Sequence, residues 1–255
     1  MSESDGRDPQ AYGTIVIVGG GCYGSYYVRQ LDRAARAGAL TAEQILVVDR
    51  DDACAVAGSL ASCAISSVLV VREWRAFFDQ YLTNAAEHPS DFARDAIVPS
   101  PLMPHLMGEW LVERARRRFG DAVTTQPFDR VPSVPWERAG TDGTHYVSFA
   151  TWMCPINCVE PRTCPHTRDE RTWSLPARLA DHAREMQDAG GHVEIATLFC
   201  RHRAYGVGMF DTAEVLAADG RIAAAGEMGS ADVIIGTVSH CHGALTRLVI
   251  GARPG

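Results

Sequence analysis

The 255-residue sequence lacks the features that mark membrane and secreted proteins. No apolar run approaches the roughly 20 residues that a transmembrane helix needs. Residues 1–10 are polar and lack the apolar core of a signal peptide. We therefore expect a cytoplasmic protein without a membrane span.

Positive charge is scarce as well, because 24 lysines and arginines face 31 aspartates and glutamates, for a net charge of −7. A chain with this balance has no overall positive field to attract nucleic acid, so we expect no nucleic-acid partner. The sequence also lacks a Walker loop, a serine nucleophile elbow, an H-E-x-x-H helix and any repeat of fixed period. Hydrolase and NTPase functions are therefore disfavoured.

What is present begins with an unbroken β-branched run at residues 14–18, followed by glycines at G-x-G-x-x-G spacing. The run predicts a strand buried on both faces, and residues 25–38 predict the helix that follows. In a dinucleotide-binding βα unit, Gly19 allows the tight turn, Gly21 lets a pyrophosphate approach the backbone, and Gly24 lets helix and strand pack closely. The candidate cofactor-binding residues are Gly19, Gly20, Gly21, Cys22, Tyr23, Gly24, Asp49 and Arg50.

Asp49 ends a second predicted buried strand, residues 44–49, somewhat further from the glycines than the usual spacing. An acid at this place holds the adenosine ribose hydroxyls and favours NAD or FAD over NADP. Arg50 beside it keeps a 2′-phosphate from being excluded. The alternative is that Asp49 only caps a helix over residues 52–58.

The remaining periodicity predicts an α/β fold with a mostly parallel sheet, helices on both faces, and an extension by a second αβ half. We expect a tail at residues 1–12, a dinucleotide-binding half at 13–126, a linker at 127–143 and the second half at 144–255. Further strands are expected at 67–71, 95–99, 145–151, 192–199 and 231–237. Further helices are expected at 73–86, from about 102 or 105 to 119, at 174–189 and at 211–218.

A cysteine cluster lies in the second half, where Cys154, Cys158 and Cys164 fall within eleven residues of a proline-punctuated loop. Such a loop folds back on itself, so its thiols can converge on a metal. If the strands carrying them are neighbours, Cys241 of the distant turn 239–242 supplies the fourth ligand of a [4Fe–4S] cluster. Zinc is the alternative metal, with His166, His240 or His242 as an alternative fourth ligand. Thiols that merely pack, a disulfide, or a redox-active thiol pair are the other interpretations.

Two histidines are candidate catalytic residues, and His105 has three interpretations, which are ligand contact, proton transfer and a purely structural role. His105 is expected near a helix start at the carboxyl end of the fourth strand, where ligands bind in open α/β sheets. His240 lies in the turn that carries Cys241.

Residues 14–52 resemble the Rossmann NAD(P)-binding superfamily, and in particular the nucleotide-binding domain of TrkA-type potassium-uptake regulators. The resemblance rests on Gly19, Gly21, Gly24 and Asp49 and implies bound NAD or NADH. We therefore expect a nucleotide-binding redox protein with a cysteine-ligated metal centre near the dinucleotide cleft. The alternatives are a non-enzymatic NAD-binding sensor or assembly subunit with structural zinc, and a zinc-dependent dehydrogenase. The expected partners are the dinucleotide and a redox partner protein, and the chain is expected as a homo-oligomer or a subunit of a complex.

Overall fold

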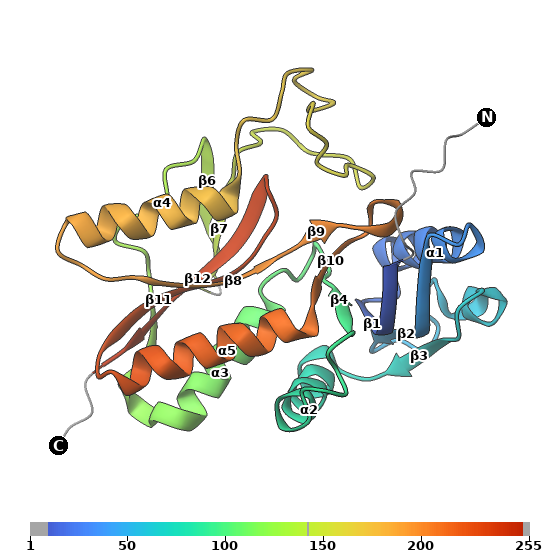
Figure 1. Ribbon diagram of the computed structural model, residues 1–255, viewed down its shortest axis with the longest axis horizontal. Helices are drawn as coiled ribbons and strands as arrows, with labels where there is room; N and C mark the ends of the chain where they lie inside the picture. Colours follow the sequence, from blue (N-terminus) through green and yellow to red (C-terminus); the bar gives the residue numbers. More distant parts are fainter. Residues whose placement is uncertain (1–9, 142, 252–255) are drawn as a thin grey trace. The chain divides into compact units, whose positions relative to one another are not determined.

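The computed structural model describes residues 10–141 and 143–251, which form two compact units (Figure 1). Unit 1 comprises Met1–Ser100 and His202–Thr212, and unit 2 comprises Pro101–Arg201 and Ala213–Gly255. Both units combine helices with a sheet, so the predicted α/β class is confirmed.

Unit 1 holds a sheet with the strand order β3-β2-β1-β4-β10-β9. The neighbouring pairs among the first four strands are parallel, and β10 runs antiparallel to β4. The strands are β1 (Gln10–Val18), β2 (Leu40–Asp49), β3 (Ser67–Val71), β4 (Ala96–Val98), β9 (Arg201–His202) and β10 (Gly208–Asp211). The order 3-2-1-4 is also found in doubly wound α/β sheets.

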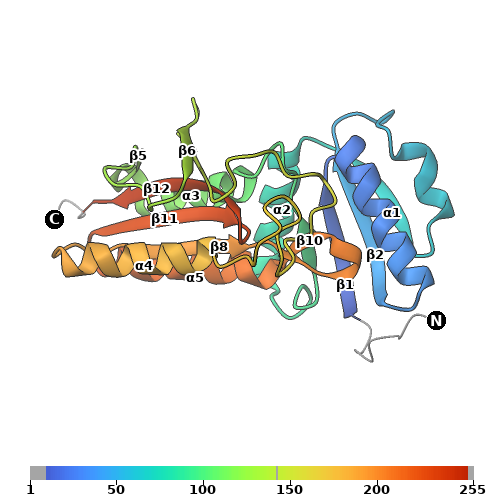
Figure 2. The same cartoon turned by 90° about the horizontal axis from the view of Figure 1, so that it is seen from above.

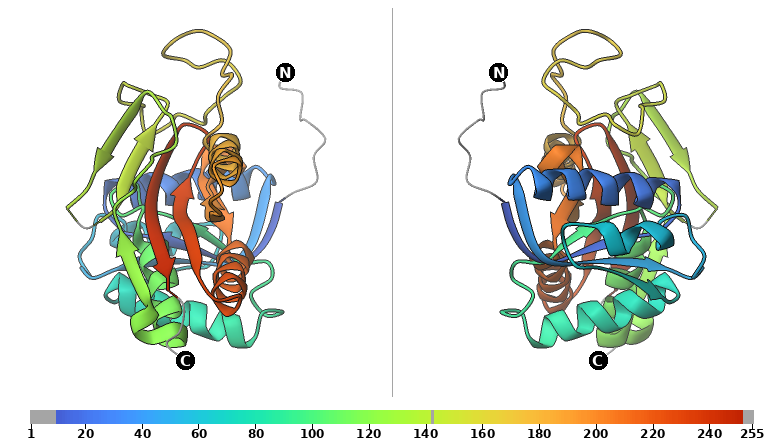
Figure 3. Two further views of the ribbon diagram at one scale, coloured as in Figure 1. Left: turned by 90° about the vertical axis from the view of Figure 1, so that its left-hand side faces the viewer. Right: turned by 90° about the vertical axis from the view of Figure 1, so that its right-hand side faces the viewer.

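Two helices lie on opposite faces of this sheet, α1 (Cys22–Arg36) and α2 (Trp74–Glu87) (Figure 3). Alternate strand residues such as Ile15 and Val47 are fully buried against Leu31 of α1 in one apolar cluster. Short 3-10 helices, η1 (Ala57–Ser62) and η3 (Ala204–Gly206), complete the unit. Burial of both faces explains why the strands of this sheet are continuous apolar runs in the sequence.

The start of the chain differs from the predicted tail. Residues 10–12 belong to β1 and pair with the beginning of β2, so the ordered part begins earlier than residue 13. The rest of the predicted tail, residues 1–9, lies outside the described residues.

Unit 2 builds a separate sheet with the order β6-β7-β12-β11-β8, and β5 also pairs with β12. Its strands are β5 (Val123–Gln126), β6 (Trp136–Ala139), β7 (His145–Ser148), β8 (Glu194–Phe199), β11 (Ala231–Val238) and β12 (His242–Ile250). The β11–β8 pair is parallel and the other pairs are antiparallel. The second half therefore adds a mixed sheet of its own, and the long hairpin of β11 and β12 lies at its centre (Figure 2).

Helices cover both faces of this second sheet (Figure 1), with α4 (Leu175–Asp188) on one face and α3 (Leu106–Phe119) and α5 (Thr212–Glu227) on the other. Leu175 and Leu179 of α4 are fully buried against Val147, Ile234 and Leu245 of the sheet. A 3-10 turn, η2 (Gly120–Ala122), joins α3 to β5. No helix among the described residues is both long and apolar enough to cross a bilayer.

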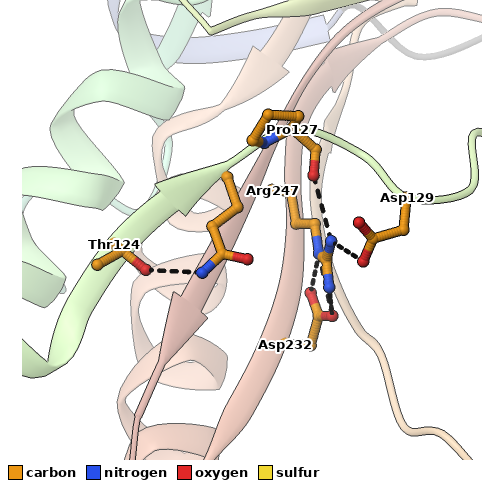
Figure 4. A network of polar contacts seen from close by, with 6 residues as sticks. Thr124, Pro127, Asp129, Asp232 and Arg247 are labelled. Carbon is orange, nitrogen blue, oxygen red and sulfur yellow. Dashed lines mark hydrogen bonds and ion pairs between the residues drawn. The ribbon is translucent and has the colours of Figure 1, made fainter.

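The predicted linker, residues 127–143, lies inside unit 2 and contains β6. Its first part is attached to β12 by Arg247, whose guanidinium donates to the carbonyl of Pro127 at 3.2 Å and to the Asp129 carboxylate at 2.5 Å (Figure 4). The same guanidinium donates to Asp232 of β11 at 2.7 Å. The first part of this Pro- and Gly-rich segment is thus held against the sheet by the hydrogen bonds of Arg247.

Candidate functional site

The glycine turn between β1 and α1 is shaped by three of its glycines. Gly19 has a φ of +87°, in the left-handed region that favours glycine. A Cβ at Gly20 would lie 2.3 Å from the sulfur of Cys54, and a Cβ at Gly24 would lie 1.9 Å from the carbonyl oxygen of Gly19. The fold itself therefore requires glycine at these three positions.

Gly21 differs from the other glycines of the turn. It is the exposed N-cap residue of α1, and a Cβ there would meet no atom within 4 Å. No side-chain hydrogen bond caps α1 at Gly21, and the first turn of the helix holds no acidic residue. Cys22 is exposed and Tyr23 half-buried at this end. The open space beside Gly21 and the helix N-terminus can together receive a phosphate.

Asp49 lies beneath the same turn, at the end of β2, and is only 9% exposed. Its Oδ2 accepts a hydrogen bond from the N–H of Gly20 at 2.6 Å, and its Oδ1 accepts one from the N–H of Asp51 at 3.0 Å. The carboxylate of Asp49 therefore joins the glycine turn to the turn after β2. No α-helix follows over residues 52–58.

Arg50, the next residue, points away from this internal network. It is exposed, and its guanidinium carbon lies 5.4 Å from the ring centre of Trp74. Trp74 is held in place because its indole N–H donates to the carbonyl of Val48 at 2.9 Å.

The cysteine loop of unit 2 connects β7 to α4 without regular structure, apart from an isolated bridge between Thr163 and Glu170. Backbone bonds fold it back on itself: the N–H of Cys158 donates to the carbonyl of Pro155, and the N–H of Arg168 donates to that of Cys164. Arg168 has a φ of +65°, as such reversals require. The loop therefore has the reversing shape that the sequence predicts.

Glu160 ties this loop to the turn between β11 and β12. Its Oε1 accepts hydrogen bonds from the hydroxyl of Ser239 at 2.6 Å and from the N–H of Cys241 at 3.0 Å, and its Oε2 accepts one from the N–H of His240 at 2.8 Å. Strands β7 and β12, which carry the two turns, are paired neighbours. The cysteine loop and the β11–β12 turn are therefore in contact through Glu160.

Neighbouring thiols affect the ionisation of two candidate ligands, Cys154 and Cys241. Burial raises the pKa of Cys154, and Cys158, Cys164 and Glu160 raise it further. Burial, followed by Glu160 and Cys154, raises the pKa of Cys241 to about 12. The pKa of Cys164 is lowered instead, chiefly because the backbone N–H of Thr167 donates to its sulfur. Cys154 is thus within electrostatic reach of the other three sulfurs, and Cys164 and Cys241 lie in different surroundings.

The thiols do not form a closed coordination sphere in the described structure. Within residues 10–141 and 143–251, no group of three or more His, Cys, Asp or Glu side chains is arranged to hold a metal ion. All eight cysteines are free thiols. The sulfur of Cys241 instead accepts a hydrogen bond from the indole N–H of Trp173 at 3.2 Å. The metal centre stays a prediction.

The histidines of the β11–β12 turn are oriented by serine hydroxyls. The Nδ1 atoms of His240 and His242 lie 3.1 Å from Ser174 Oγ and 2.9 Å from Ser148 Oγ. Ser148 donates its proton to the carbonyl of Ala150, so the Nδ1 of His242 carries the proton between them and its Nε2 keeps a lone pair. Burial lowers the pKa of both histidines.

The other two candidate histidines lie elsewhere in unit 2. His105 is the N-cap residue of α3, with its Nε2 3.9 Å from Oε1 of Glu109. His166 stacks on Trp152, with 4.4 Å between ring centres. The hydrogen bonds of Glu160 that join the cysteine loop to the β11–β12 turn involve neither histidine.

The sequence analysis missed four residues that organise the cysteine region: Ser148, Glu160, Trp173 and Ser174. Only Glu160 gave a signal, because it lies between Cys158 and Cys164. The others contact the turn through the fold, from β7 and from the start of α4.

Comparison with known proteins adds a family without a described activity. No curated protein and no solved structure matches the chain. A family model with the description "Uncharacterized protein, C-terminal domain" (AF_1314_C) matches residues 107–251, which include the cysteine loop and the β11–β12 turn. Because this match covers more than half of the sequence, the chain belongs to that family.

Proposed function

We propose that the chain is a nucleotide-binding redox protein that takes a dinucleotide, NAD(H) or FAD as the sequence favours, at the β1–α1 turn of unit 1. One observation carries the proposal. Three glycines of the turn are required by the fold, whereas Gly21 leaves open space at an uncapped helix N-terminus. Packing within unit 1 explains the turn but not this opening.

The residues present fit a pyrophosphate. The first backbone N–H groups of an α-helix have no acceptor within the helix, and the helix dipole favours negative charge at this end. Asp49 holds Gly20 in place, so the turn is already formed before a ligand arrives. The bound nicotinamide or flavin supplies hydride chemistry, and the protein supplies position and surroundings.

Gly21→Asp tests this assignment with purified full-length protein and NADH fluorescence. The new carboxylate enters open space and opposes the pyrophosphate, so we expect at least about a 10-fold loss of affinity. Gly220→Asp is the matched control, because Gly220 is exposed in α5 and has the same open surroundings. Equal affinity of wild type and Gly21→Asp for the nucleotide, or no binding of NADH, NADPH or FAD by wild type, contradicts the proposal.

A metal held by Cys154, Cys158, Cys164 and Cys241 is the second element of the proposal. The hydrogen bonds of Glu160 favour it, because they bring the fourth thiol to the loop that carries the other three. Thiolates suit an iron–sulfur cluster or zinc, and binding either requires the thiols to lose their protons.

Metal and sulfide analysis of anaerobically prepared protein tests the second element. Iron with sulfide and a broad brown absorbance support the redox function. A single zinc per chain favours the sensor, assembly-subunit or zinc-dehydrogenase alternatives. Cys158→Ser should lower the metal content, whereas Cys63→Ser in unit 1 should leave it unchanged. Metal-free protein after anaerobic preparation with iron, sulfide and zinc supplied contradicts this element.

A redox partner protein, or a second copy of the chain, follows as the proposed route for electrons. The experiment is anaerobic mixing of NADH with the metal-loaded protein. Oxidation of one NADH to NAD⁺ releases two electrons and one proton; a [4Fe–4S] cluster accepts one electron, so the cluster of a second chain or the partner protein accepts the other, and the proton goes to solvent. Bleaching of the iron–sulfur absorbance on addition of NADH supports the redox function over the sensor alternative.

A further inference from the structure

The carboxylate of Asp49 is committed to the backbone of its own unit. Both oxygens accept N–H groups, from Gly20 at 2.6 Å and from Asp51 at 3.0 Å, and the residue is 9% exposed. Recognition of both ribose hydroxyls requires a carboxylate that faces the ligand. Asp49 is therefore better placed to hold the glycine turn than to select an unmodified ribose.

The exposed charge at the end of β2 is the guanidinium of Arg50. It lies over Trp74 at 5.4 Å, and the indole is fixed by its bond to the Val48 carbonyl. Among the described residues, Arg50 has no carboxylate partner within ion-pair distance. A guanidinium resting on an aromatic ring keeps its edge free for a second, bidentate interaction.

The neighbouring strand adds a second cation at the same edge of the sheet. Arg72 follows β3, is exposed, and donates its backbone N–H to the carbonyl of Asp49 at 2.8 Å. Two exposed acids in the turn after β2, Asp51 and Asp52, carry the opposite charge. Asp51 is turned toward its own loop, because its Oδ1 accepts the N–H of Ala53 at 2.9 Å.

From this arrangement we infer that unit 1 prefers a dinucleotide whose adenosine ribose carries a 2′-phosphate, NADP(H), and that Arg50 is the residue that determines this preference. The inference rests on the proposed function, because it concerns the same site. It reverses the preference for NAD or FAD that the charge of Asp49 suggests in the sequence. The reason is that the acid faces inward while the adjacent base faces solvent.

Separate titrations with NADPH and NADH, followed by nucleotide fluorescence at one ionic strength, test the inference. We expect wild-type protein to bind NADPH at least about 10-fold more tightly than NADH, since hydrogen bonds to charged groups are the stronger ones. Arg50→Gln should remove most of this ratio by weakening NADPH, with NADH affinity changed less than about 2-fold. Arg29→Gln, an exposed arginine of α1, should leave both affinities unchanged.

The outcomes separate the two proposals. If NADH binds as tightly as NADPH or more tightly, the inference is overturned while the dinucleotide site stands. If the ratio survives in Arg50→Gln, Arg50 does not determine it and the inference is likewise overturned. If neither nucleotide binds, the proposed dinucleotide function fails first. Because Arg50 is exposed, unfolding of Arg50→Gln is not expected, and circular dichroism verifies this.

Discussion

Glu160 accepts a hydrogen bond from the backbone N–H of His240, 80 residues further along the chain, at 2.8 Å. Together with its bonds to Ser239 and Cys241, this contact makes one carboxylate the link between the cysteine loop and the β11–β12 turn. Glu160 itself has a φ of +47°, so the loop accepts an unfavourable backbone conformation where the link is made.

We predict that Glu160→Ala destabilises the protein by about 2–4 kcal/mol, because the change leaves several donors of the turn without their charged acceptor. The free energy of unfolding in urea provides the measurement. Glu170→Ala is the control from the same loop, since Glu170 forms an exposed pair with Arg162. Exposed pairs contribute about 0–1 kcal/mol. Equal effects of the two variants would show that the link is not structural.

Gly24 and Gly21 should respond differently to alanine. Gly24→Ala places a Cβ 1.9 Å from the carbonyl oxygen of Gly19, so backbone must move, and we expect a loss of more than about 2 kcal/mol or failure to fold. Gly21→Ala meets no atom within 4 Å and should keep its stability within about 0.5 kcal/mol of wild type. Thermal unfolding of the two variants measures the difference. Comparable destabilisation by both would refute the account of this turn.

Tyr81 contributes a hydrogen bond to Asp95, the residue that precedes β4 in the sheet of unit 1. Its hydroxyl donates to Oδ2 of Asp95 at 2.7 Å, and Asp95, 5% exposed, also accepts the N–H of Thr14 at 2.7 Å. Tyr81→Phe leaves this carboxylate short of a donor and should cost about 1–3 kcal/mol. Tyr205→Phe, at a 40% exposed position, should change stability by less than about 0.5 kcal/mol. Denaturant unfolding of both variants decides the point.

Stability should fall in mild acid because of His182, which is 2% exposed in α4. Burial lowers its pKa, and the charges around it are Glu185, Arg178, Arg130 and Asp232. The unfolded state takes up the proton near pH 6.5 while the folded state resists it, so the full stability is present above that pH and is lost as pH falls below it.

His182→Leu removes this contribution. The slope of the unfolding free energy between pH 7 and pH 5 should become shallower, and the remaining slope includes His240 and His242, whose pKa values are also lowered. Equal slopes in wild type and variant over this range would exclude His182 as a source of acid sensitivity.

The sequence by itself determined the opening βα unit and the ends of several elements. The β-branched run, the glycine spacing and the apolar stripe of α1 are local patterns, and β3 lies at residues 67–71 as predicted. The folding back of the cysteine loop also follows from local residues, its prolines and closely spaced thiols.

Only the tertiary structure decided which groups these local elements meet. It turned Asp49 inward to Gly20, made β12 a central strand of a second sheet, and placed Glu160 against His240. The physical reason is that a carboxylate bonds whichever donors the packing brings within reach. Gly20 lies 29 residues from Asp49 and His240 lies 80 residues from Glu160, so no local pattern of residues encodes these two bonds.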